Sequence, residues 1–115
     1  MRRNIKKLEE KIEDAKSKNS KARAYYELGL FHDNNNREEK AIPNYEMALK
    51  LGLPSKIEAR ALAWLASSLY KKVRLKEAKS NILKSQTSTK EPNLLHFLEG
   101  LRKRINNSMK KQNNF

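Results

Sequence analysis

Residues 25–48 read YYELGLFHDNNNREEKAIPNYEMA, and a related pattern returns 37 residues later, at residues 62–85, as LAWLASSLYKKVRLKEAKSNILKS. Internal repetition of this length is the sequence signature of stacked supersecondary units. Six positions keep their size or apolar character at this one offset: Tyr25 with Leu62, Leu28 with Leu65, Gly29 with Ala66, Ala41 with Ala78, Tyr45 with Ile82, and Ala48 with Ser85. Since the offset is constant across two helices, the chain is predicted to contain the same helical pair twice.

The sequence outside the repeat also follows helical spacing. Apolar residues recur at steps of three and four, which places them on one face of an α-helix. No run of alternating apolar and polar residues is long enough to predict a strand. The spacing predicts six helices, at about residues 1–18, 21–32, 36–51, 55–72, 75–86 and 92–105.

Short polar residues and glycine indicate where these helices begin and end. Asn19-Ser20 is predicted to cap the second helix, Asn36 to form a capping box before the third, and Ser55 to cap the fourth. Gly52 is predicted to end the third helix in a left-handed conformation. Residues 85–90 are predicted to form a linker before the last helix.

Composition limits what kind of protein this is. The chain has 115 residues and 26 Lys+Arg against 13 Asp+Glu, a formal net charge of +13. It has no cysteine, which excludes disulfides and cysteine-ligated metals, and its three glycines cannot form a phosphate-binding loop. The longest apolar run, residues 61–66, is far too short to span a membrane. We expect a cytoplasmic, non-catalytic protein with no cofactor and no metal.

The repeated pattern resembles the tetratricopeptide repeat. The first unit has Tyr25-x₂-Leu28-Gly29-x₂-His32, then Ala41-x₃-Tyr45-x₂-Ala48, with a proline after the second helix. The second unit keeps the side-chain sizes and loses the aromatic residues. The stretch Ala41-Ile42-Pro43-Asn44-Tyr45-Glu46 followed by Leu51-Gly52-Leu53 is similar to small single-domain bacterial members of this family.

This resemblance implies an all-α fold, a short right-handed α-solenoid of two helix pairs with a capping helix at each end. Residues 1–107 are expected to form one domain, with a flanking helix at 1–18, repeats at about 20–53 and 55–90, and a capping helix at 92–107. Residues 108–115 are expected to be a basic, disordered tail. Two and a half units are few for a stable stack. Either the flanking helices cover the open ends, or a second copy of the chain does so in a homodimer.

The resemblance also implies a site. Such proteins bind partners in a concave groove lined by the first helix of each unit. The groove positions fall on Arg23, Tyr26, Leu30, Asp33 and Asn34 in the first unit, and on Arg60, Ala63, Ser67, Tyr70 and Lys71 in the second. This basic, aromatic groove suits an acidic peptide or a partner helix. The carboxylate clamp of some relatives is not expected, because Leu30 and Trp64 occupy its positions. Trp64, within an apolar helix, is predicted to pack in the core or between helices.

A nucleic-acid-binding role is the main alternative. Residues 71–90 contain seven basic residues and one acidic residue, and the chain from residue 101 onward has five basic residues and no acidic one. Such an excess is typical of RNA-binding surfaces, and equally of charge that serves only solubility. No nucleic-acid motif is present, and the aromatic residues are not interleaved with the basic ones. His32 and His96 are single histidines in different units, which does not suggest a metal site.

Overall fold

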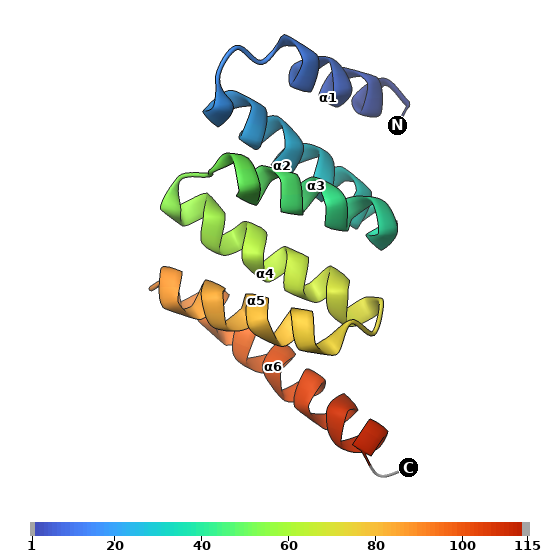
Figure 1. Ribbon diagram of the computed structural model, residues 1–115, viewed down its shortest axis with the longest axis vertical. Coiled ribbons are helices and arrows are strands. Elements are labelled where there is room, and N and C mark those ends of the chain that lie inside the picture. The colour runs from blue at the N-terminus through green and yellow to red at the C-terminus, as the bar shows by residue number, and fades with distance from the viewer. Residues whose placement is uncertain (1, 114–115) are drawn as a thin grey trace.

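The computed structural model describes residues 2–113, with side chains from residue 5 onward, and this part of the chain is all-α (Figure 1). Successive helices run antiparallel and stack into a short helical-repeat solenoid, with the two ends of the chain at opposite ends of the stack. The helices are α1 (Arg2–Asp14), α2 (Lys18–Asn34), α3 (Glu38–Leu51), α4 (Ser55–Lys71), α5 (Leu75–Ser88) and α6 (Pro92–Asn113).

The 37-residue repeat is confirmed in the backbone. Both α2 and α4 have 17 residues, both α3 and α5 have 14, and each helix begins 37 residues after its counterpart. The turns within the two pairs also match, since Asn36 and Val73 take the same left-handed conformation, with φ of 58° and 59°. The last helix, α6, begins at Pro92, again 37 residues after Ser55. The sequence offset therefore records a geometric repeat.

The matched small residues allow the helices of each pair to approach closely. Gly29 is buried on α2, and a Cβ added there would lie 2.6 Å from Cδ1 of the fully buried Tyr45 on α3. In the second pair the matched positions hold Ala66 and Ile82, both fully buried in one core cluster. Compared with the first pair, the second has alanine in place of glycine on its first helix and isoleucine in place of tyrosine on its second helix. The smaller side chain of Ile82 on α5 thus leaves room for the methyl group of Ala66 on α4.

The core is unevenly distributed along the stack. Its larger cluster is made of buried residues from α3, α4, α5 and α6. The stripe of α6 that packs there is buried and consists of Leu94, Leu98, Leu101 and Ile105. By contrast, Ile5, Leu8 and Ile12 of α1 are only half-buried against α2. Both flanking helices cover the repeats, as expected, but α6 is the more firmly packed of the two.

Several predicted helix ends are wrong, because the same polar residues can cap a helix or lie within it. The N-cap of α2 is Ser17, whose hydroxyl accepts from the Ser20 backbone N–H at 3.1 Å in a capping box, so Ser20 lies inside the helix. Asn36 adopts the left-handed turn, and Arg37 precedes α3 without a side-chain cap. Ser55 is the first residue of α4 rather than its cap. The left-handed Gly52, with φ of 104°, is confirmed.

The C-terminal half is more helical than the sequence indicated. The predicted linker belongs largely to α5, and Ser85 is buried there with its hydroxyl donating to the Ala59 carbonyl at 2.7 Å. Leu83 is 54% exposed, because residues 78, 82 and 85 occupy the buried face of α5. The expected disordered tail continues α6 as far as Asn113, and Met109 packs against the core. Residues 114 and 115 lie outside the described part of the chain.

Candidate functional site

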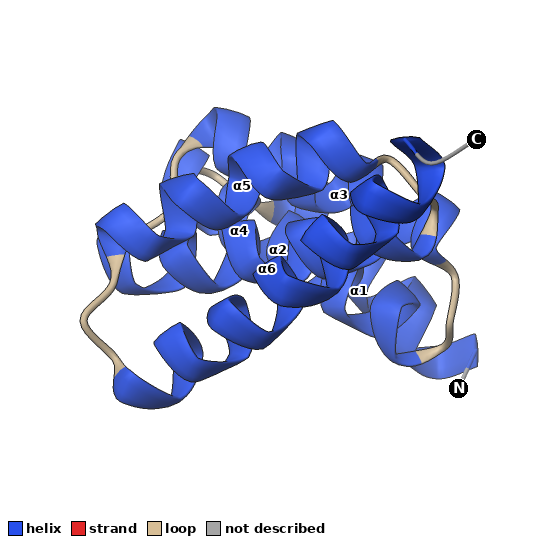
Figure 2. Ribbon diagram, turned by 90° about the horizontal axis from the view of Figure 1, so that it is seen from below, coloured by secondary structure: helices blue, strands red, loops and turns tan. Residues whose placement is uncertain are grey.

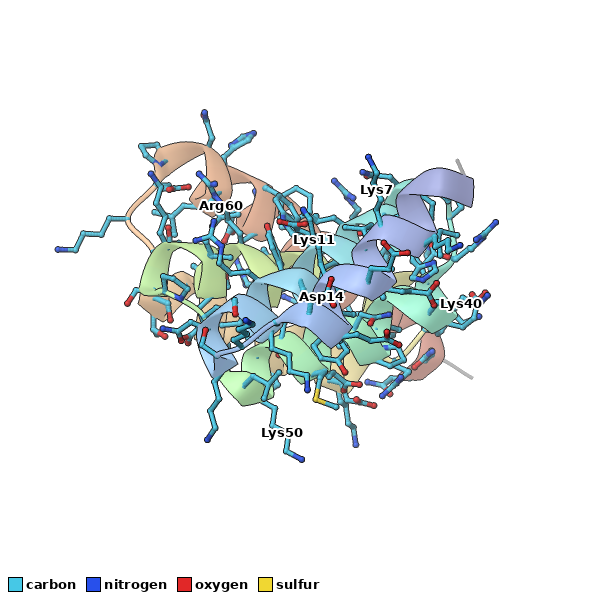
Figure 3. The ribbon with its side chains drawn as sticks, turned by 90° about the horizontal axis from the view of Figure 1, so that it is seen from above. Lys7, Lys11, Asp14, Lys40, Lys50 and Arg60 are labelled. Carbon is cyan, nitrogen blue, oxygen red and sulfur yellow. The ribbon has the colours of Figure 1, made fainter. Side chains whose placement is uncertain are left out.

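The candidate site lies on the side of the molecule opposite α3 and α5. Viewed along the stack, α1 and α6 flank this side, and α2 and α4 lie between them (Figure 2). Seen from the other end, the labelled side chains of Lys11 and Arg60 lie on this side, whereas Lys50 points away on the opposite one (Figure 3). Any guest on this surface would therefore contact mainly the first helix of each unit.

Two hollows on this side share the indole of Trp64, and we call them together the groove. The larger, of about 470 Å³, is lined by Leu30, Asp33, Asn34, Asn36, Trp64 and Lys71. The smaller, of about 280 Å³, is lined by Arg60, Trp64, Glu91, Asn93, Leu94 and Phe97. The side chains of α2, α4 and α6 thus form one continuous surface with an aromatic residue at its centre.

The indole is held by contacts with both neighbouring units. Its Nε1–H donates to the Tyr26 hydroxyl at 3.2 Å, and its ring meets Phe97 edge-to-face, with centroids 5.2 Å apart and planes at 70°. Burial raises the pKa of Tyr26 above its ordinary value, so the hydroxyl stays protonated, and its oxygen accepts this bond through a lone pair. The position of Trp64 is therefore set across three helices before any guest arrives.

A second hydrogen bond fixes the polar end of the larger hollow. Tyr45 donates its hydroxyl to the Asp33 carboxylate at 2.8 Å, and its ring lies tilted against Tyr26 with centroids 6.2 Å apart. Burial, together with the neighbouring Asp33 carboxylate, strongly raises the pKa of Tyr45. The phenol stays protonated, which keeps Asp33 as a hydrogen-bonded carboxylate at the edge of the groove.

The cations of the groove have acidic partners within the fold. Lys71 lies 3.5 Å from Oε1 of Glu38, whose side chain is 14% exposed. Arg60 lies 3.2 Å from Oε1 of Glu91, and Lys56 reaches the same oxygen at 3.6 Å. The two pairs made by Glu91 are partly exposed and contribute little to stability, because water screens them. They do keep the charged groups in place around the hollows.

The residues that the sequence placed in the groove divide into three groups. Arg60, Lys71, Asp33, Asn34 and Leu30 line the two hollows. Tyr26, Ser67 and Tyr70 are half-buried and line neither hollow, although the Tyr26 hydroxyl accepts the hydrogen bond from Trp64. Arg23 lines a separate hollow between α1 and α2, and the prediction for Ala63 is wrong because that residue is fully buried.

Other residues of the groove were missed from the sequence. Trp64 does pack between helices as predicted, and it also lines both hollows. Phe97 and Glu91 belong to the third, incomplete unit, in which no groove residue was predicted. The signal that could have found Phe97 is its distance from Arg60, which is again 37 residues.

Two further observations concern metal binding and the basic segment at 71–90. Among the described residues, no three His, Asp or Glu side chains are close enough to hold a metal ion. Within the basic segment at 71–90, Lys71 pairs with Glu38, and Arg74 pairs with Glu77. None of the helices in residues 2–113 is long and apolar enough to cross a bilayer.

Comparison with known families agrees with the fold. The family model described as Tetratrico peptide repeat matches residues 22–113, which covers α2 to α6 apart from the first residues of α2. The chain belongs to this family of helical-repeat proteins, which generally serve as non-catalytic scaffolds for protein–protein interaction. No curated protein and no solved structure gives a significant match to the chain.

Proposed function

We propose that the protein binds a peptide segment or a helix of a partner protein in the groove, and that this partner is acidic. The observation that carries the proposal is the pair of hollows on either side of Trp64, with Arg60 beside one and Lys71 beside the other. The family supports it, because its members generally bind other proteins.

Physical chemistry favours an apolar anchor at the centre of the groove. Trp64 and Phe97 present large, rigid, half-buried rings whose ordering on binding loses little conformational entropy. Aromatic residues in the middle of an interface, surrounded by polar groups, contribute most of the binding energy in typical complexes. A guest therefore places an apolar side chain against Trp64.

Electrostatics favours an acidic guest. The chain has a formal net charge of +13, so an anionic partner is attracted at long range and associates faster. Nucleic acid would share that attraction, but two basic residues of the segment at 71–90 are already paired with carboxylates. We therefore favour a peptide over RNA.

The test is a selection of displayed random 12-residue peptides, lacking tryptophan, on the full chain. Trp64 is the sole tryptophan, so its emission reports directly on occupation of the groove. Selected peptides should shift that emission, and Phe97→Ala should weaken binding by about tenfold, which corresponds to about 1.4 kcal/mol. Leu83→Ala is the matched control, since it shortens an exposed apolar side chain on α5 outside both hollows.

Three results would overturn the proposal. The first is that the selection yields no peptide. The second is that the selected peptides bind without changing Trp64 emission and with equal affinity to the Phe97→Ala variant. The third is that single-stranded RNA binds more tightly than every selected peptide, with an affinity that falls as a steep power of salt concentration.

A further inference from the structure

We infer that Arg60 binds a carboxylate of the guest and that Glu91 competes with the guest for it. This inference rests on the proposed function, and it names the group in the groove that recognises acidic partners. It is carried by the unusual way in which Arg60 is paired within the fold.

The pairing of Arg60 differs from that of two other arginines in the described structure. Arg74 and Arg102 each use Nε and Nη2 together, so that two nitrogens meet the two oxygens of a nearby glutamate. This two-nitrogen fork is the strong geometry of an arginine–carboxylate pair. In Arg60, by contrast, Nη2 alone donates to Glu91, and it lies 3.2 Å from Oε1 and 3.3 Å from Oε2. Its Nε–H and Nη1–H groups are left for another acceptor.

The partner of Arg60 does not depend on it. Glu91 also lies 3.6 Å from Lys56, so it keeps a cation when Arg60 turns to a guest. Its backbone is fixed independently, since its N–H donates to the Thr89 hydroxyl at 3.1 Å and its carbonyl accepts from the Leu95 N–H at 3.0 Å. Lys56, Arg60 and Glu91 together carry one net positive charge, and one further carboxylate neutralises them.

The location of this cluster indicates which carboxylate it takes. Arg60 and Glu91 line the smaller hollow, whose apolar side is formed by Trp64, Leu94 and Phe97. A single guest can therefore bind Arg60 while an adjoining apolar side chain enters the hollow. The guest is a peptide in which a Glu or Asp stands next to a large apolar residue.

Because Glu91 occupies Nη2, it holds the affinity for such a guest below the value that Arg60 alone would give. Removing the charge of Glu91 frees the whole guanidinium for the guest. Exposed and partly exposed ion pairs of this kind change affinities by about three- to tenfold. Glu91 thus acts as an internal pseudo-ligand.

The experiment uses the full chain and one acidic peptide taken from the selection above. The same peptide is made with its Glu or Asp replaced by Gln or Asn, and with its C-terminus either free or amidated. Binding of each is followed by Trp64 emission for wild type, Glu91→Gln and Arg60→Gln. Glu77→Gln is the matched control, because it frees Arg74, the N-cap residue of α5, which lines neither hollow of the groove.

If Arg60 binds the guest carboxylate, wild type prefers the acidic peptide, Glu91→Gln binds it about three- to tenfold more tightly, and Arg60→Gln no longer discriminates it from the neutral peptide. Glu77→Gln should leave the affinity unchanged. The amidated peptide should bind as tightly as the free one if a side chain supplies the carboxylate, and loss on amidation would assign the site to the chain terminus.

The inference fails if Glu91→Gln leaves the affinity unchanged, or if Arg60→Gln retains the preference for the acidic peptide. In either case the peptides still bind and still shift Trp64 emission, so the groove itself stands. If no peptide is selected at all, the proposed function fails and the inference fails with it.

Discussion

Replacing Gly29 with alanine should destabilise the protein, although alanine is normally the better helix former. The added methyl carbon would lie 2.6 Å from Cδ1 and 2.7 Å from Cε1 of Tyr45, well inside van der Waals contact. The ring has little freedom to retreat, because Tyr45 is fully buried and its hydroxyl is bonded to Asp33. One of the helices must therefore move.

The magnitude follows from two opposing effects. Inserting a methyl group into a packed core destabilises by about 1–3 kcal/mol, and two contacts under 3 Å place this site near about 3 kcal/mol. Alanine gains about 1 kcal/mol over glycine in a helix interior. The net loss is about 2 kcal/mol, which for a chain of this size lowers the melting temperature by about 8 °C.

Thermal and urea unfolding, followed by helical circular dichroism, measure this difference. Gly100→Ala is the matched control, since the nearest atom to its added Cβ is Nη2 of Arg104 at an ordinary 3.8 Å. That variant should be more stable than wild type by up to about 1 kcal/mol. If Gly29→Ala is as stable as Gly100→Ala, the close approach of α2 and α3 is not what requires glycine.

The second repeat supplies a further test of the same argument. Its matched positions hold Ala66 and Ile82 in place of Gly29 and Tyr45. Tyr45→Ile should therefore make Gly29→Ala less harmful, so that the double variant is more stable than the sum of the two single changes predicts. A double-mutant cycle measures this coupling. Strict additivity would contradict the packing account.

Four other substitutions test separate features of the fold. Val73→Asn should stabilise by about 1 kcal/mol in urea unfolding, because a β-branched residue with φ of 59° is strained and the equivalent turn of the first unit has asparagine. Ser85→Ala should lose about 1 kcal/mol with its buried hydrogen bond, whereas Ser68→Ala should be neutral or stabilising, because that buried hydroxyl has no partner among the described residues. Burial of His32, followed by the nearby Lys40 and Arg37, lowers its pKa below 6.5. The unfolded chain then binds more protons, so stability should fall as pH drops below about 6.5, and less so in His32→Gln. Equal pH dependence of the two proteins would refute this.

The repeat could be predicted from the sequence because it depends on side-chain size at a fixed spacing. Gly29, Ala41 and Tyr45 lie where helices meet, and those positions tolerate few alternatives. The helix ends were harder to predict. Asparagine suits both an N-cap and a left-handed turn, and only the path of the chain after Asn36 decides between them.

The groove was only partly predictable, and the reason lies in α6. Arg60 and Lys71 follow from the register of the second unit, which is the same as that of the first. The orientation of α6 about its axis is set instead by its own buried stripe of Leu94, Leu98, Leu101 and Ile105. Leu94 and Leu101 stand 37 residues after Ile57 and Trp64, which are only half-buried on α4, so the stripe does not simply repeat the buried face of the earlier units. The contributions of Glu91 and Phe97 depend on that orientation. No spacing rule within the repeat specifies it.

The uneven placement of the core affects how the chain folds while it is being synthesised. The helices leave the ribosome in order, and the larger cluster requires residues of α6. Between the appearance of α4 and that of Ile105 about 50 residues must be added, which takes roughly 3–10 seconds at about 5–20 residues per second. During that interval the nascent α4 and α5 expose the apolar face that α6 later covers, and a chaperone would meet the protein there first.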